Sequence, residues 1–286
     1  MRIALGTVQF GMKYGVANTS GQVHKEVVKD TLKLALKSGI DVLDTARAYG
    51  ESEEILGYSG VENFKIVSKI PPVEEGNKNL VNMIKMSVTQ SLTNLGCESL
   101  YGLLLHRPAD LLRQNGLDIY ASLLELKKQG IVEKIGISVY GPDDLDKLSD
   151  FQFDLVQAPM NILDRRMEKS GWLRRLSMQG TEIHIRSVFL QGLLLMKKSQ
   201  RPKYFLPWQN LLSVYDNWII ENKLTPLQAC LGFLNNYTEI DKVVVGVTSP
   251  KQLKEVISAS SEASVSLPEK LRTNESALIN PAEWLL

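Results

Sequence analysis

The sequence predicts a closed (β/α)8 barrel, the TIM barrel fold, and three observations favour this fold. Short runs rich in Val, Ile and Leu alternate with segments of helical periodicity, which is typical of parallel strands joined by crossover helices. Eight such runs occur in the 286 residues. Their starts are about 34 residues apart on average, which is the size of one βα unit.

The eight apolar runs are the predicted strands. They begin at Arg2 (RIALGT), Asp41 (DVLDTA), Phe64 (FKIVSKI), Leu100 (LYGLLLH), Lys134 (KIGISVY), Asp154 (DLVQAPM), Glu182 (EIHIRSVF) and Lys242 (KVVVGV). A doubly wound open sheet is the alternative, but such a sheet normally has a G-x-G-x-x-G turn after its first strand. Gly6, Gly11 and Gly15 lack that spacing, so the barrel is favoured.

Local signals place helices between these strands. A glycine that can end a helix follows each of three periodic segments, residues 26–38, 79–95 and 121–129. Pro250 stands where it can open another helix. Most of the predicted helices are therefore bounded by residues that favour a helix end.

The interval between the seventh and eighth strands is the longest. It holds a polar stretch at residues 197–203 and two helical segments at residues 208–222 and 225–237. We expect an extended loop and helix insertion here, within one domain that spans residues 1–286. The C-terminal tail is expected to pack back through Trp284.

Composition excludes several classes of function. The 33 Lys and Arg residues balance 32 Asp and Glu, so no global charge attracts nucleic acid or a membrane surface. Cys97 and Cys230 lack the spacing of a disulfide framework or a metal site, and no metal is expected. Neither a signal peptide nor a membrane span is visible, which favours a cytoplasmic protein. We expect a small-molecule partner and a monomer or weak homo-oligomer.

Polar side chains stand where three adjacent predicted strands end. Asp44 ends the second strand and Tyr49 follows in the next loop, while Lys69 and His106 end the third and fourth strands. The functional face of such a barrel is built at the carboxyl ends of its strands. Alternation along the strands turns Lys69 and His106 to the inner face, so the four side chains are expected to converge.

These four residue types suit the delivery of a proton to a carbonyl oxygen. Tyr49 is the predicted donor, and a neighbouring Lys69 ammonium lowers the pKa of a phenol from its ordinary value of about 10. Asp44 is expected to pair with Lys69, and His106 to donate a hydrogen bond to the substrate oxygen. A buried structural ion pair beside a loop aromatic is the alternative interpretation. None of the four is a strong nucleophile, so the chemistry needs a separate hydride source.

The run from Gly39 to Gly57, GIDVLDTARAYGESEEILG, resembles a characteristic segment of the aldo-keto reductase family. Lys69 and His106 fall where the other two members of that family's catalytic tetrad are expected. The resemblance continues through KIGISVY, VQAPMN, FLQGLL and VVVGVTSPKQLKE and covers nearly the whole chain. It implies an enzyme that reduces an aldehyde or ketone with NADP(H) or NAD(H). A cofactor-binding regulatory protein of the same fold, with little turnover, is the alternative.

The resemblance also implies which residues bind the nicotinamide dinucleotide. Ser138 and Gln157 match positions that hydrogen-bond the carboxamide, and Gly192 lies in the segment around the pyrophosphate. Four further residues match the turn and helix start that hold the adenosine end: Gly246, Thr248, Ser249 and Glu255.

Three positions depart from the family pattern. Val139 replaces an Asn that often follows the serine of the fifth strand. Arg186 replaces the aromatic ring that commonly stacks beneath the nicotinamide, and its planar guanidinium can stack or contact phosphate. Gln252 replaces a basic residue that often binds the 2′-phosphate of NADP, which leaves the choice between NADP and NAD open.

Basic residues follow the seventh strand: Lys197, Lys198, Arg201 and Lys203. We expect them near the pocket mouth, where they would attract an anionic substrate such as a phosphorylated or nucleotide-linked keto sugar. The alternative is a solvated charge run, or a loop that folds over the pyrophosphate of the cofactor. Residues 164–166, Asp-Arg-Arg, are expected to form a solvated helix start.

Overall fold

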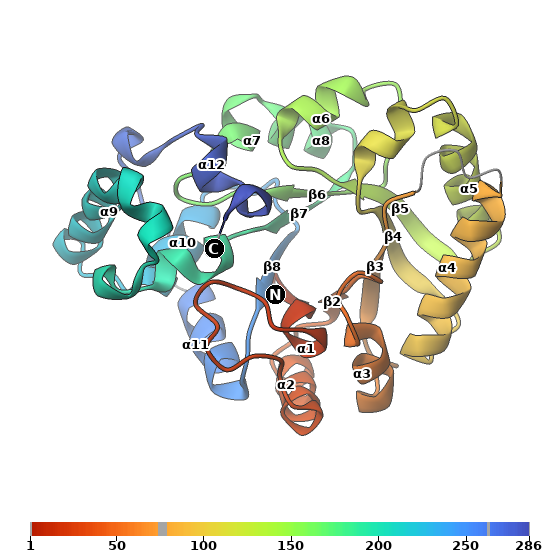
Figure 1. Ribbon diagram of the computed structural model, residues 1–286, viewed down its shortest axis with the longest axis horizontal. Coiled ribbons are helices and arrows are strands. Elements are labelled where there is room, and N and C mark those ends of the chain that lie inside the picture. Colours follow the sequence, from red (N-terminus) through yellow and green to blue (C-terminus); the bar gives the residue numbers. More distant parts are fainter. Residues whose placement is uncertain (1, 74–78, 262–263, 286) are drawn as a thin grey trace.

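The computed structural model is a closed barrel of eight parallel strands surrounded by helices (Figure 1). It describes residues 2–73, 79–261 and 264–285. The strands follow chain order around the barrel, and the last strand pairs with the first. The predicted fold class is therefore confirmed. The strands are β1 (Ile3–Gly6), β2 (Val42–Asp44), β3 (Lys65–Ile70), β4 (Leu100–Leu105), β5 (Val132–Ser138), β6 (Leu155–Pro159), β7 (Glu182–Arg186) and β8 (Lys242–Gly246).

Side chains alternate between the inside of the barrel and the helix layer. Val67, Leu104 and Leu155 belong to a small apolar cluster inside the barrel. Leu103 and Leu105 instead pack in the large core beneath the helices. The alternation predicted for the third and fourth strands is thus confirmed, and each strand begins within two residues of its predicted start.

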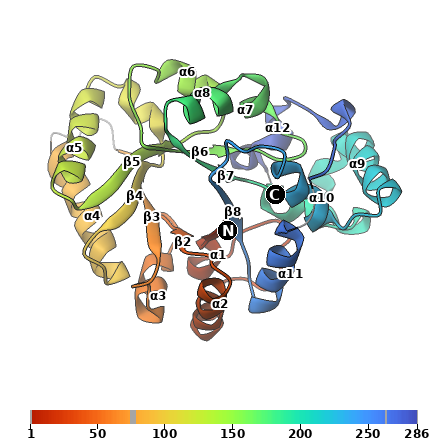
Figure 2. The same cartoon turned by 180° about the vertical axis from the view of Figure 1, so that it is seen from behind.

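The helices cover the outside of the barrel, as the two opposite views show (Figures 1 and 2). No described helix is long and apolar enough to cross a membrane. Gly96, at a φ of 65°, ends α4 in the left-handed conformation that glycine adopts without strain. The helices are α1 (Val8–Gly11), α2 (Lys25–Lys37), α3 (Ser52–Ser59), α4 (Leu80–Leu95), α5 (Gly116–Lys128), α6 (Pro142–Lys147), α7 (Arg166–Lys169), α8 (Trp172–Met178), α9 (Gln209–Glu221), α10 (Pro226–Leu234), α11 (Pro250–Ser260) and α12 (Ser276–Ile279).

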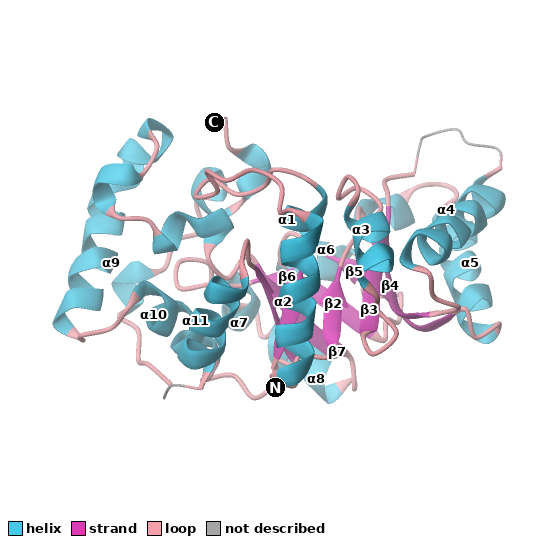
Figure 3. Cartoon of the chain, turned by 90° about the horizontal axis from the view of Figure 1, so that it is seen from below, coloured by secondary structure: helices cyan, strands magenta, loops and turns pink. Residues whose placement is uncertain are grey.

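The insertion between β7 and β8 contains α9 and α10, as predicted, and α9 stands at the outer edge of the molecule (Figure 3). The C-terminal tail packs against this insertion. The ring of Trp284 meets that of Phe205 edge-on at a centroid distance of 4.8 Å, and its Nε1 donates to the Leu278 carbonyl. The expected return of the tail through Trp284 is therefore confirmed.

Candidate active site

Four of the predicted residues meet at the carboxyl ends of β2, β3 and β4. Asp44 is the last residue of β2, and His106 directly follows β4. Lys69 lies in β3 beside Leu104 of β4. Tyr49 comes from the turn between β2 and α3. Parallel strands in register therefore bring together residues that are up to about sixty positions apart in the sequence.

A buried ion pair between Asp44 and Lys69 forms the centre of this group. Lys69 Nζ donates to both carboxylate oxygens at 2.8 Å and to the Thr45 carbonyl at 2.9 Å. The Lys69 and Asp44 side chains are 0% and 5% exposed. Burial lowers the pKa of Lys69, but the charge of Asp44, the neighbouring Tyr49 and the hydrogen bonds to both together outweigh burial, so the pKa lies above its ordinary value. Lys69 is thus an ammonium ion at neutral pH, as expected.

Tyr49 lies against this ammonium ion. Lys69 Nζ is 5.0 Å from the centroid of the Tyr49 ring. Burial raises the pKa of Tyr49 and Lys69 lowers it, and burial has the larger effect, so the pKa lies above its ordinary value. The expected net lowering is therefore wrong, because desolvating a phenolate costs more than the nearby cation offsets. Tyr49 is a protonated phenol at neutral pH, which is the form that can donate a proton.

His106 stands edge-on to Tyr49. The two ring centroids are 5.9 Å apart, and the rings are inclined by 83°. Burial, together with the positive charge of Lys69, lowers the pKa of His106 to about 4. The imidazole is therefore neutral at physiological pH, with one nitrogen able to donate a hydrogen bond to a bound oxygen.

A hydrogen-bonded chain links the ion pair to β5 and β6. Gln157 Nε2 donates to Asp44 Oδ1 at 2.6 Å, and Ser138 Oγ donates to Gln157 Oε1 at 3.3 Å. All three side chains are buried. Of the two residues predicted to bind a carboxamide, Gln157 is thus in direct contact with the ion pair and Ser138 is linked to it through Gln157, an arrangement that sequence spacing does not reveal.

A cleft of about 840 Å³ opens over these strand ends. Of the predicted site residues, Lys69 and Ser249 do not line it. Lys69 is fully buried beside Asp44, and the Ser249 hydroxyl caps α11 by accepting from the Gln252 backbone N–H at 3.2 Å. The predicted residues that do line the cleft are Asp44, Tyr49, His106, Ser138, Gln157, Arg186, Gly192, Gly246, Thr248, Gln252 and Glu255.

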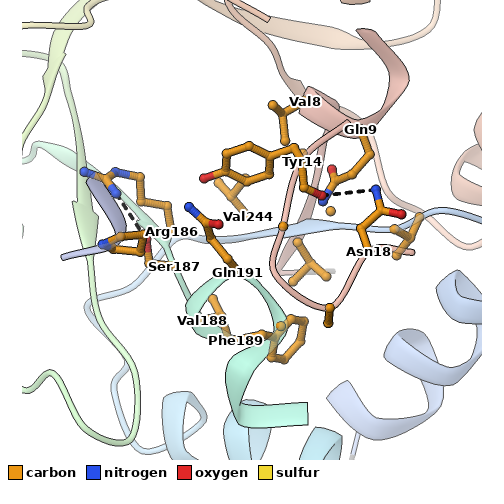
Figure 4. Close-up of a pocket in the computed structure, with 18 of the residues that line it drawn as sticks. Val8, Gln9, Tyr14, Asn18, Arg186, Ser187, Val188, Phe189, Gln191 and Val244 are labelled. Atoms are coloured by element: carbon orange, nitrogen blue, oxygen red, sulfur yellow. Dashed lines mark hydrogen bonds between the residues drawn. The ribbon is translucent and has the colours of Figure 1, made fainter. Parts of the chain in front are cut away.

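Several residues of the cleft wall were not predicted from the sequence. Figure 4 shows Tyr14 and Gln9 on the connection after β1, facing Gln191 on the turn after β7. Tyr140 follows β5 and also lines the cleft. Their positions in the sequence could have identified them, since all four residues follow the carboxyl ends of strands, where a barrel carries its functional loops.

The turn after β7 has an unusual backbone. Ser187, Leu190 and Gln191 have φ values of 59°, 45° and 52°, in the left-handed region that non-glycine residues rarely adopt. At Gly192, a Cβ atom would lie 2.5 Å from Ala17 Cβ, so only glycine fits. The Ala17 backbone N–H also donates to the Gln191 carbonyl at 3.4 Å. The connection after β1 and the turn after β7 therefore meet along one wall of the cleft.

The cleft has features that fit a nicotinamide dinucleotide. Gln9 Oε1 is buried without a hydrogen-bond partner among the described residues, and it lies where an added Cβ on Gly246 would approach it to 2.5 Å. Hydroxyl and amide groups of Ser138 and Gln157 stand at one part of the cleft, and Gly192 lines its wall. These groups match the carboxamide, hydroxyl and phosphate groups of such a cofactor, so the residues present fit it.

The part of the cleft formed by β8 and α11 carries little positive charge. Gln252 Oε1 accepts from the Thr248 backbone N–H at 2.8 Å and from the Thr248 hydroxyl at 3.1 Å. Glu255 lines this part of the cleft, whereas Lys251 and Lys254 are exposed and are not among its lining residues. Gln252 is therefore already engaged, and the nearest charged lining residue of α11 is an acid.

The basic residues after β7 are those expected near the pocket mouth. None of these four cationic residues lines the cleft. Arg201 instead donates to Asp216 of α9 at 2.8 Å, which neutralises its charge. Lys197, Lys198 and Lys203 are exposed, which agrees with the alternative of a solvated charge run, and a position near the pocket mouth stays a prediction.

Residues 164–166 form a helix start as predicted, since α7 begins at Arg166, but two of the three are not solvated. Asp164 is 0% exposed and Arg165 is 5% exposed, so neither is solvated. Asp164 accepts from Arg166 Nε and Nη2, each at 2.9 Å, and Arg165 donates to the Pro268 carbonyl at 2.9 Å. The C-terminal tail buries this segment, and a contact so distant in sequence leaves no local signal.

Comparisons with known proteins agree with this fold. The sequence model of the Aldo/keto reductase family matches residues 2–270. An NADH-specific methylglyoxal reductase of Escherichia coli K12 is 26% identical over an alignment of 300 positions, which covers 90% of this chain and 89% of that protein.

Two solved structures share the fold. An aldo-keto reductase from Bacillus halodurans, in its holo form, superposes with a TM-score of 0.75 at 20% identity, over 93% of this chain and 88% of the other. A glycerol dehydrogenase from Gluconobacter oxydans gives a TM-score of 0.71 at 19% identity, over the same shares of the two chains.

Proposed function

This chain belongs to the aldo/keto reductase family, and from that membership and the geometry of its cleft we propose that it reduces an aldehyde or ketone with NADH, using Tyr49 as the proton donor. The family is one of oxidoreductases that reduce carbonyl groups with NAD(P)H. One observation carries the assignment of residues. A buried Asp44–Lys69 pair lies beside a protonated Tyr49 and a neutral His106 at the floor of one cleft.

Each protein group has one task in this proposal. When bound, the nicotinamide dinucleotide supplies the hydride that reduces the carbonyl carbon. Tyr49 Oη gives its proton to the carbonyl oxygen, and the charge of Lys69 stabilises the phenolate that remains. Asp44 keeps Lys69 protonated in a buried site, and neutral His106 donates a hydrogen bond that orients the carbonyl oxygen. The products are an alcohol and the oxidised cofactor.

The cleft favours NADH over NADPH. A 2′-phosphate needs a cation, but Gln252 is engaged with Thr248 and the nearby Glu255 repels a phosphate. A carboxylate suits the ribose 2′-hydroxyl of NAD, as in other dinucleotide sites. The relative from Escherichia coli is described as NADH-specific, which supports the same preference.

The absorbance of reduced nicotinamide, followed with a panel of aldehydes and keto sugars, tests the proposed function. We expect turnover with NADH that is faster, at equal concentrations below KM, than with NADPH. Tight NADH binding with no turnover of any carbonyl compound would favour the regulatory alternative. Keto sugars belong in the panel as one of several substrate classes, since the basic stretch that suggested them lies outside the cleft.

A further inference from the structure

The turn between β2 and α3, which carries Tyr49, contains two buried hydroxyl groups that the proposed mechanism does not use. Thr45 directly follows β2, and Ser52 is the first residue of α3. Both residues are 0% exposed, and neither is among the described residues that line the cleft. They can therefore affect the reaction only through another residue.

A third hydroxyl, from Thr7 directly after β1, joins the two in a chain. Thr45 Oγ1 and Ser52 Oγ are 3.2 Å apart, and Ser52 Oγ donates to Thr7, whose carbonyl and hydroxyl oxygens are each 2.9 Å away. Thr7 Oγ1 donates to the Asp44 carbonyl at 3.0 Å. A hydroxyl has one hydrogen to donate, and those of Thr7 and Ser52 are both in use. Thr45 is therefore the donor to Ser52.

This chain closes the turn at its neck. The bond between Thr45 and Ser52 joins the two ends of the segment that holds Tyr49. The Thr45 carbonyl accepts from Lys69 Nζ at 2.9 Å, and the Ser52 backbone N–H donates to the Tyr49 carbonyl at 3.1 Å. The two residues that supply the hydroxyls thus contact the ammonium ion on one side and the Tyr49 backbone on the other.

Backbone packing holds the tip of the same turn against α1. A Cβ atom at Gly11 would lie 1.9 Å from the Tyr49 carbonyl oxygen, and one at Gly50 would lie 2.4 Å from the Gly11 carbonyl oxygen. The Glu51 backbone N–H donates to the Gly11 carbonyl at 3.3 Å. The turn is therefore fixed by backbone contact at its tip and by side-chain hydroxyls at its neck.

From this geometry we infer that the hydroxyls of Thr45 and Ser52 hold Tyr49 in the position from which it donates its proton. Both are positioning residues, and the inference rests on the proposed function. Proton transfer needs the donor oxygen within hydrogen-bond reach of the oxygen that it protonates. A misplacement of about 1 Å at a reacting group can lower a rate by about 100-fold. Loss of one hydroxyl loosens the neck of the turn without removing a group that touches substrate or cofactor.

Variants that remove one hydroxyl each test the inference. Thr45→Val removes the donor and nearly preserves the shape of the side chain, and Ser52→Ala removes its acceptor. We expect each variant to lower kcat by about 10-fold, less than the loss for a 1 Å misplacement, with the dissociation constant of NADH within twofold of wild type. Thr45→Ser keeps the hydroxyl and should restore kcat to within about twofold of wild type. Circular dichroism reports on folding, and two separate positions leave one test if the other variant folds poorly.

Matched controls remove buried hydroxyls elsewhere. Thr31→Val on α2 and Ser122→Ala on α5 each delete a hydroxyl that donates within its own helix, to the Val27 and Asp118 carbonyls. Both residues are buried, and neither is among the described residues of the cleft lining. Each control should leave kcat within twofold of wild type.

Coupling to Tyr49 separates positioning from a general loss of stability. In a Tyr49→Phe background, Thr45→Val should lower the residual kcat by less than twofold, because the group that Thr45 positions is already gone. Fluorotyrosine placed at position 49 gives a fluorine NMR signal that does not require turnover. We expect Thr45→Val to shift or broaden this signal and Thr31→Val to leave it unchanged.

Three results would overturn the inference. One is a kcat within twofold of wild type in both Thr45→Val and Ser52→Ala. Another is an equal loss in Thr45→Ser or in the controls, which would assign the effect to packing. The third is an equal loss in the Tyr49→Phe background, which would show that Thr45 acts through another group. A wild-type enzyme that reduces no carbonyl compound contradicts the proposed function instead, and the fluorine signal of Thr45→Val then decides whether the hydroxyls position Tyr49.

Discussion

The two ends of the barrel carry clusters of the same four residue types, an acid, a lysine, a tyrosine and a histidine. The first is Asp44, Lys69, Tyr49 and His106 at the carboxyl ends of the strands. The second lies near their amino ends and consists of Glu182, Lys134, Tyr101 and His184. Only the first cluster opens into the cleft. Their difference shows which features of such a cluster allow chemistry.

The difference lies in what the carboxylate binds. Tyr101 Oη donates to Glu182 at 2.6 Å and accepts from Lys134 at 2.8 Å, while Lys134 also pairs with Glu182. His184 hydrogen-bonds to the same carboxylate at 2.7 Å. In the first cluster, Asp44 binds Lys69 and Gln157, so the Tyr49 hydroxyl is not committed to the acid. A tyrosine whose proton is held by a carboxylate stabilises the fold, whereas one that faces a cleft can release it.

The sharpest way to break this comparison is to remove each tyrosine hydroxyl in turn. We expect Tyr49→Phe to lower kcat by about 10³-fold with little change in NADH affinity, because proton donation is made only in the transition state. Tyr101→Phe should lower the free energy of unfolding and leave kcat near wild type, since Tyr101 is not among the residues that line the cleft. Steady-state kinetics and chemical denaturation measure both. Substantial activity in Tyr49→Phe would contradict its proposed role.

The second expected effect concerns Glu182, the acid of the second cluster. Glu182→Gln leaves Lys134 without its carboxylate, and we expect a loss of about 3 kcal/mol in the free energy of unfolding at neutral pH. Glu125→Gln, an exposed control on α5, should change it by less than about 0.5 kcal/mol. Equal free energies of unfolding for the two variants would show that the second cluster does not stabilise the fold.

The same residue predicts a pH dependence. Burial raises the pKa of Glu182, but hydrogen bonds from His184, Lys134 and Tyr101 outweigh it and lower the pKa to about 2. The unfolded chain takes up this proton near the ordinary value of 4.5, so the stabilisation is complete above that pH and is lost as the pH falls from about 4.5 to about 2. The wild type should therefore lose stability faster than Glu182→Gln across this interval.

The comparison also explains how much the sequence could predict. The strands could be predicted because buried parallel strands are continuous apolar runs. The residues at their carboxyl ends could be predicted because the fold determines where those ends meet. Asp44, Lys69 and His106 were therefore found from position alone. Gln157 was placed near the cofactor by resemblance, but its bond to Asp44 depends on contact across the barrel.

The features that the sequence does not predict depend on the balance of opposing effects on a pKa and on packing between segments that are distant in sequence. The direction of the Tyr49 pKa follows from burial outweighing a nearby cation, and no sequence pattern gives either magnitude. Asp164 and Arg165 are polar residues after a strand, a pattern that normally indicates solvent. They are buried because the tail, about a hundred residues later, covers them.

A smaller effect sharpens the comparison at His106. Because its pKa is lowered to about 4, the imidazole stays neutral above that pH, and its protonation cannot limit activity. We expect kcat/KM to show no acid limb near the ordinary histidine value of about 6.5. An acid limb near that value that disappears in His106→Asn would show that His106 is protonated in the free enzyme.

The smallest expected effect lies at the far end of the cleft, away from both clusters. Gln252→Arg places a cation where the resemblance puts the 2′-phosphate of NADP, and it releases Thr248 from its bond to the Gln252 side chain. We expect NADPH affinity to rise by about fivefold, the equivalent of one partly exposed ion pair, with NADH affinity nearly unchanged. Ser258→Arg adds the same charge farther along α11 at an exposed position outside the cleft lining, and it should leave the two affinities in their wild-type ratio. Fluorescence titration of each variant with both cofactors measures this, and salt should weaken the gain because the new pair is exposed. If Gln252→Arg and Ser258→Arg change NADPH affinity equally, the adenosine end lies elsewhere, and the inferred preference for NADH needs another cause.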